Sequence, residues 1–186
     1  MSWINELMLI WVQLSANLPS SIMTHMIFNT TNNPKTKELV AAWQQYAATM
    51  GDWRKLVDGV TPKETYCGPV YEPTSPLNRP NESFAIADMR GVKVAEPHYH
   101  AGGEIETYFI ISGSGLTVVG GEELQVKAGD VIVTPPETAH FTLPKENLVM
   151  VVINTPPFDP DNNIRVDESK PDVKYDHKQF KKLAGV

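Results

Sequence analysis

The second half of the chain consists of short strand-like segments, and this pattern restricts the fold more than any other feature. Runs rich in β-branched and alternating apolar residues cover residues 83–89, 92–95, 107–112, 116–119, 123–127, 131–134 and 148–154. Gly120 and Gly121, between two of these runs, are typical of a two-residue hairpin. Many short strands with such turns predict an all-β fold, either an antiparallel sandwich or a barrel. Because no internal repeat is visible, we expect one barrel.

The segments on either side of this region differ from it in composition and in the spacing of their apolar residues. Asn33 and Pro34 suit the N-cap and first position of a helix, and apolar residues at helical spacing follow them. Prolines are frequent between residues 61 and 80, which predicts an extended stretch without regular structure. We therefore expect an N-terminal helical arm over residues 1–60, a proline-rich connector over 61–80, the barrel over 81–158 and a C-terminal extension over 159–186.

The first residues of the chain are apolar and could suggest a signal peptide. No Lys or Arg precedes Lys35, however, so the basic region that begins a signal peptide is missing. Apolar residues between positions 3 and 18 recur at helical spacing, and we interpret them as an amphipathic helix that packs on the domain or on a second subunit. An over-long gene start, with Met23 or Met26 as the initiator, is the alternative.

Charge and cysteine content exclude several classes of protein. The net charge of −6 argues against nucleic acid as the main partner, because binding phosphates requires a basic face. No apolar run approaches the ~20 residues needed to cross a membrane. Cys67 is the only cysteine, so there is no intrachain disulfide and no thiolate metal cluster. This fits a cytoplasmic protein, and we interpret the Cys67 thiol as buried or inert.

Three of the five histidines combine with one carboxylate in a pattern suited to a metal ion. His98 and His100 are two residues apart, which puts both imidazoles on one face of a strand. Glu106 stands just before the next apolar run, and His140 follows a later strand and turn. Imidazole and carboxylate groups bind divalent transition ions. We predict that these four side chains hold Fe, Mn, Ni, Cu or Zn and leave coordination positions open for a substrate, water or dioxygen.

The same residues resemble the two motifs of the cupin superfamily. The positions similar to those motifs are Gly91, His98, His100, Glu106 and Gly113 for the first, and Gly129, Asp130, Pro135, His140 and Asn147 for the second. The resemblance covers residues 80–158. It implies a small single-domain protein with a cupin-type double-stranded β-helix, or jelly-roll, barrel. Cupin barrels commonly pair through a sheet face, so we also expect a homodimer with residues 3–18 near the interface.

The spacing departs from the family pattern in ways that affect the choice of ligand. Five residues separate His100 from Glu106, one or two more than is usual. Glu104 would fit the usual gap to the histidine, but it spoils the six-residue spacing to Gly113, so we select Glu106 as the ligand. Asn147 lies later than its usual place in the motif and is given no function.

Strand parity places further side chains beside the predicted metal. A pocket lined by Tyr108, Thr142, Glu96 and Glu104 follows if residues two apart from a ligand share its face. We select Tyr108 and Glu104 as candidate catalytic residues, with Tyr108 as an acid or hydrogen-bond donor and Glu104 as a base. A core tyrosine with a buried hydroxyl partner is the alternative for Tyr108.

Two classes of function fit these residues. The first is a metal-dependent enzyme that acts on a small polar or aromatic molecule. A dioxygenase is the leading form of it, an isomerase of a sugar or keto acid is the next, and a decarboxylase is the third. The second class is a non-catalytic module that binds or senses a small, sugar-like molecule. The intact ligand set favours the enzyme, although a fold by itself does not fix the chemistry.

Overall fold

The protein was analysed as a computed structural model, which describes residues 53–73, 80–166 and 175–186. In chain order its elements are η1 (Trp53–Val57), β1 (Lys63–Thr65), β2 (Gly68–Tyr71), β3 (Ser83–Asp88), β4 (Ala95–His100), β5 (Ile105–Val119), β6 (Glu122–Lys127), β7 (Val131–Thr134), β8 (His140–Thr155), η2 (Pro160–Asn162), β9 (Asn163–Arg165) and α3 (His177–Ala184). The helical arm is expected over residues 1–60, and of these only residues 53–60, which include η1, are described. The interface expected at residues 3–18 lies outside the described residues.

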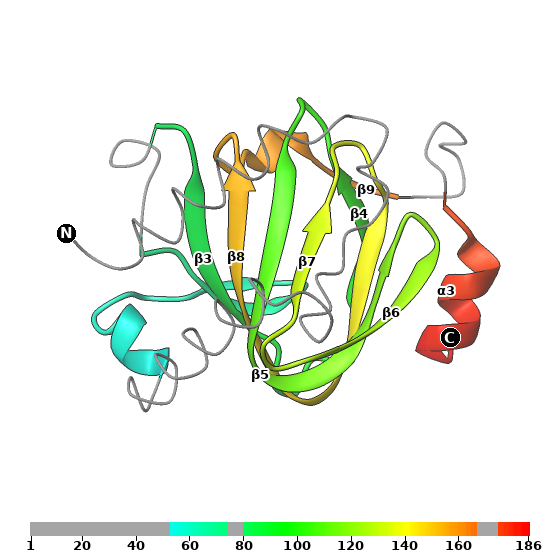
Figure 1. Cartoon of the computed structure of the whole chain (residues 1–186), viewed down its shortest axis with the longest axis horizontal. Coiled ribbons are helices and arrows are strands. Elements are labelled where there is room, and N and C mark those ends of the chain that lie inside the picture. The colour runs from blue at the N-terminus through cyan, green and yellow to red at the C-terminus, as the bar shows by residue number, and fades with distance from the viewer. Residues whose placement is uncertain (1–52, 74–79, 167–174) are drawn as a thin grey trace, which may run out of the picture.

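Two long antiparallel strands, β5 and β8, form the frame of the fold. They pair along almost their whole length, from Ile105 opposite Thr155 to Val119 opposite His140. On its other edge β8 pairs with β3 through its second half and with β4 through its first half, and β9 adds to β4. Strands β6 and β7 pair with β5. The sheet curls on itself, and the expected antiparallel β-barrel is confirmed (Figure 1).

Alternation along β5 divides its side chains between two apolar clusters. Tyr108 and Ile110 belong to the larger cluster, together with Val119, Leu148 and other buried residues. Their neighbours in sequence, including Phe109, pack in a second cluster around Val57 and Ile86, as parity predicts. Burying such a side chain contributes about 1.5–3 kcal/mol. This packing therefore fixes which face of β5 carries Glu106, two residues before Tyr108.

A third apolar cluster joins the C-terminal helix α3 to the barrel. Phe180 and Leu183 of α3 pack against Phe141 and its neighbours Leu116 and Val118. The helix begins at the N-cap Asp176, whose side chain accepts from two backbone N–H groups, and ends at Gly185 in the left-handed conformation. None of the helices within the described residues has the length and hydrophobicity to span a bilayer.

Several strand boundaries differ from the sequence-based prediction. The runs 107–112 and 116–119 are parts of the single strand β5. Register shifts between Ile110 and Gly115 absorb the small residues of this stretch without ending the pairing with β8. The run 92–95 was predicted as a strand, but only Ala95, the first residue of β4, is in one; residues 92–94 form an irregular connection that leads into β4. The left-handed φ of 80° at Gly91 marks the turn that precedes it.

The expectation that residues 61–80 lack regular structure is wrong for their first half. Lys63–Thr65 and Gly68–Tyr71 form the hairpin of β1 and β2, and β2 continues the sheet beside β3. Pro69 lies within β2 opposite Glu64. A proline costs one donor in the hydrogen-bond ladder, which is tolerated in short strands close to a sheet edge.

Candidate metal centre

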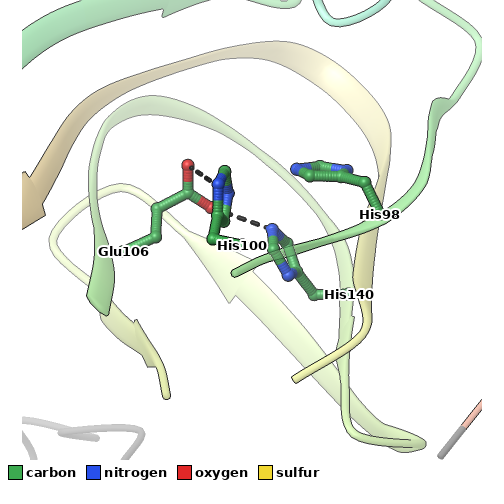
Figure 2. Close-up of side chains that lie close together, drawn as sticks. All are labelled: His98, His100, Glu106 and His140. Carbon is green, nitrogen blue, oxygen red and sulfur yellow. Dashed lines mark ion pairs between the residues drawn. The ribbon is translucent and has the colours of Figure 1, made fainter. Parts of the chain in front are cut away.

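The four predicted ligands lie together inside the barrel although they come from three strands. His98 and His100 project from β4, Glu106 from β5 and His140 from the start of β8 (Figure 2). Each offers one ligand atom, and these atoms all lie within 4.8 Å of one another. No more than 5% of any of the four residues is exposed. The chain therefore gathers a buried cluster with the donor groups that divalent transition ions prefer.

Two of the imidazoles are oriented by their own strands. Nδ1 of His98 lies 2.8 Å from the carbonyl oxygen of Glu96, and Nδ1 of His140 lies 2.9 Å from that of Thr138. A carbonyl only accepts, so each Nδ1 carries the proton and donates. Nε2 of each ring then presents its lone pair to the cluster. Such a hydrogen bond fixes both the tautomer and the ring orientation of a metal-binding histidine.

The third imidazole lies between two carboxylates. Nδ1 of His100 lies 3.1 Å from Oε1 of Glu104, and its Nε2 lies 3.4 Å from Oε1 of Glu106. Asn154 donates from Nδ2 to Glu104 at 2.7 Å and to Glu106 at 3.4 Å. Glu104 is therefore an ion-pair neighbour on the Nδ1 edge of His100, the edge opposite the atom that faces Glu106.

Three ligand atoms of the cluster, and Nδ1 of His100 beside them, are buried without a hydrogen bond from any of the described residues; the three ligand atoms are Nε2 of His100, Oε2 of Glu106 and Nε2 of His140. Nε2 of His140 is 2.9 Å from Oε2 of Glu106 but lacks the alignment of a hydrogen bond. Leaving a buried polar atom unpaired costs about 1–3 kcal/mol. A cation among these three atoms would remove that cost, so the residues fit a metal ion.

The charges of the cluster also suit a cation. Burial, reinforced by His140, lowers the pKa of His98 to about 3, so this imidazole is neutral near neutral pH. Burial alone would raise the pKa of Glu106, but His100 and His140 hold it well below its ordinary value. Burial likewise opposes charge on His100, yet Glu106 and then Glu104 raise the pKa of His100. The cluster thus contains a neutral imidazole and an ionised carboxylate, both ready to bind a metal.

The residues expected to line the pocket take different positions. Tyr108 is buried, and burial and then the nearby Glu106 carboxylate raise the pKa of Tyr108 well above its ordinary value. Thr142 is also buried, and its hydroxyl is paired with that of Thr117 at 3.1 Å. Glu96 was predicted to line the pocket, but its side chain is exposed and does not. A bulge between Ala95 and His98 breaks the alternation and turns Glu96 to the surface.

Sequence reasoning missed two residues that contact the cluster. Asn154 lies directly opposite Glu106 in the β5–β8 pairing, and only the strand register reveals this position. Tyr66, in the turn between β1 and β2, packs the edge of its ring against His98, with 5.3 Å between the ring centroids. The prediction of a connector without structure hid this tyrosine. Its neighbour Cys67 is partly buried and packs against the core, and burial raises its pKa to about 12.

Comparisons with known proteins agree with the fold. Residues 88–154 match the family model of the cupin domain. A protein from Planctomyces limnophilus aligns with a TM-score of 0.52 and 20% identity, over 58% of this chain and 91% of that one. A variant of PAC13 from Streptomyces, solved with uridine, aligns with a TM-score of 0.50 and 17% identity, over 60% of this chain and 88% of that one. No curated protein sequence matches significantly.

Proposed function

Because residues 88–154 form a cupin domain, with a buried cluster that could hold a metal ion, we propose that the protein is a metal-dependent enzyme acting on a small molecule. The observation that carries the proposal is the set of three buried ligand atoms left without hydrogen bonds. His98, His100, Glu106 and His140 would hold a divalent ion of Fe, Mn, Ni, Cu or Zn. When bound, such an ion acts as a Lewis acid, and a redox-active ion also supplies electrons for reaction with dioxygen.

Among the reactions open to such a site, an oxygen-dependent one fits the surrounding residues best. Isomerisation needs a carboxylate or similar group that is free to move a proton between substrate atoms. Glu104, the candidate for that role, already accepts a hydrogen bond from Asn154 and lies against the Nδ1 edge of His100. We therefore propose that Glu104 positions His100, and that the enzyme is dioxygenase-like, with a small polar or aromatic substrate.

Tyr108 has a related part in this proposal. Its ring packs in the apolar core, and burial and the Glu106 carboxylate raise the pKa of its hydroxyl, which therefore stays protonated near neutral pH. The ring would thereby supply an apolar wall that keeps water from the reacting atoms.

The engagement of Glu104 and the burial of Tyr108 also favour a second function, a non-catalytic module that binds a small molecule. In that case the cluster would hold a structural or ligand-anchoring ion, and no side chain would need to exchange protons. The two functions predict the same metal content but differ in turnover. Oxygen uptake with any member of a panel of small phenols, diketones and hydroxy acids would decide for the enzyme. Saturable binding without a product would decide for the module.

Elemental analysis of protein purified without chelators or affinity-metal resin is the first test. We expect about one transition metal ion per chain in the wild type and its loss in the double variant His98→Ala/His140→Ala. His177→Ala is the matched control, because this histidine lies on α3, outside the cluster. Equal metal content in all three proteins would contradict the assignment of the site. Absence of metal from the wild type, even after reconstitution, would contradict metal dependence altogether.

A further inference from the structure

A second polar cluster lies beside the candidate metal centre, on the edge strand β9. This strand pairs with β4 so that Arg165 is opposite His98 and Asn163 is opposite His100. Figure 1 shows β9 beside β4 at one end of the sheet. Residues directly opposite each other in an antiparallel pair project from the same face of the sheet. Asn163 and Arg165 therefore share the face on which β4 carries its two ligand histidines.

Tyr66 connects these two residues to the metal centre. Its hydroxyl accepts a hydrogen bond from Nδ2 of Asn163 at 3.0 Å. The guanidinium carbon of Arg165 lies 5.0 Å from the centre of the Tyr66 ring, and that ring makes a T-shaped contact with His98. These three side chains run from solvent into the protein, since the Arg165 side chain is 62% exposed and His98 is 3% exposed. They form a continuous polar path from the barrel rim to the ligands.

The positive charge of Arg165, at the outer end of this path, is only weakly neutralised. Nη1 of Arg165 lies 2.8 Å from Oε2 of Glu96, and both side chains are largely exposed. Exposed ion pairs are worth little, about 0–1 kcal/mol, so a competing anion can replace this one.

We propose that Arg165, Tyr66 and Asn163 form an anion subsite that selects small carboxylate-bearing molecules for the metal centre. A guanidinium presents a planar fork of donors that matches a carboxylate in two parallel hydrogen bonds. The Tyr66 hydroxyl and the Asn163 amide supply further polar contacts along the molecule, whose other end reaches the ligand cluster. The proposal rests on the proposed function and narrows its substrates to hydroxy, keto or aromatic acids.

The test compares two acids with a neutral molecule of the same shape. Benzoate, benzamide and pyruvate are titrated separately into the metal-free protein, followed by calorimetry, and into the Co²⁺-loaded protein, followed by its visible spectrum. The variants are Arg165→Gln, which removes the cation, and Glu96→Gln, which removes its present partner. Arg54→Gln is the matched control. The guanidinium carbon of Arg54 likewise lies 5.0 Å from the centre of an aromatic ring, but that ring belongs to Trp53, which packs on Tyr71 and not on His98.

We expect benzoate to bind more tightly than benzamide, and Arg165→Gln to weaken the binding of both acids about tenfold or more. Glu96→Gln should strengthen it, and Arg54→Gln should leave it unchanged. A purely structural role of Arg165 would not produce opposite effects from the two rim variants. Equal binding of benzoate and benzamide, no change in Arg165→Gln, or no binding of either acid would overturn the subsite. Failure of Co²⁺ to bind would instead overturn the metal proposal, while calorimetry on the metal-free protein still decides the subsite.

Discussion

Gly91 and Gly113 provide a matched pair for testing how the barrel is held together. Both occupy the left-handed region, with φ of 80° and 76°. A Cβ added at Gly91 would meet no described atom within 4 Å, whereas one at Gly113 would lie 1.8 Å from the carbonyl oxygen of Glu146 and 2.5 Å from the carbonyl carbon of Asn147. The same substitution to alanine therefore adds backbone strain at both positions and a collision with the backbone at only one.

The expected losses of stability follow from these two terms. The left-handed conformation costs an L-residue about 1–2 kcal/mol, so Gly91→Ala should lower the free energy of unfolding by that amount. Gly113→Ala carries the same strain and also forces apart β5 and the Glu146–Asn147 backbone of β8, and overpacking of this kind costs a further ~1–3 kcal/mol. We expect a total loss of about 2–5 kcal/mol, which removes a large part of the stability of a small domain.

Urea unfolding followed by circular dichroism would measure both losses. The midpoint should fall for both variants with an unchanged slope, and it should fall distinctly further for Gly113→Ala. Failure of Gly113→Ala alone to accumulate as folded protein would agree with the same reasoning. Equal losses in the two variants would refute it, because they would show that β8 yields to a methyl group at no cost.

Three further outcomes are expected. Co²⁺ or Mn²⁺ at a hundredfold excess over Kd should stabilise the folded wild type by about 2.7 kcal/mol and so raise its melting temperature. His140→Ala should abolish this rise, and an equal rise in both proteins would contradict the site. Burial opposes a charge on Asp88, but Arg90 lowers the pKa of this carboxyl below its value in the unfolded chain. The stability lost in Asp88→Asn should therefore be greatest above about pH 4 and should shrink as the pH falls. A loss of stability that grows toward acid pH would contradict this reasoning. The Cys67 thiol, with its pKa raised to about 12, should react with an aromatic disulfide reagent far more slowly in the native protein than in the urea-unfolded chain near about pH 8; equal rates would show that the thiol is exposed.

Local sequence patterns were sufficient to predict the barrel and the ligand cluster because both depend on short-range geometry. Two-residue spacing determines that His98 and His100 share a face whatever the partner strand is. The burial of Tyr108 follows from the same alternation along β5. In each case a period of two survives because packing on the inner face of the barrel enforces it.

The errors arose where one strand meets another or where the alternation is interrupted. The register shifts near Gly113 keep β5 continuous through a segment whose small residues indicate a turn. The bulge after Ala95 moves Glu96 from the expected inner face to the rim. Asn154 and Arg165 become neighbours of the ligands only through the pairing of β8 with β5 and of β9 with β4. Register of this kind is a property of the folded sheet, and no local pattern in one strand encodes it.

The four candidate ligands also differ in whether local contacts or strand pairing orient them. His98 and His140 are each held by a carbonyl two residues earlier in their own chain segment, so their geometry survives as long as β4 and the start of β8 form. His100 and Glu106 instead depend on Glu104 and Asn154, which meet only when β5 has paired with β8. The first pair of candidate ligands, His98 and His140, is therefore positioned locally, and the second pair, His100 and Glu106, only when the barrel has closed. A metal ion that needs all four ligands would bind the closed barrel far better than any partly formed state, and its binding energy would stabilise that closure.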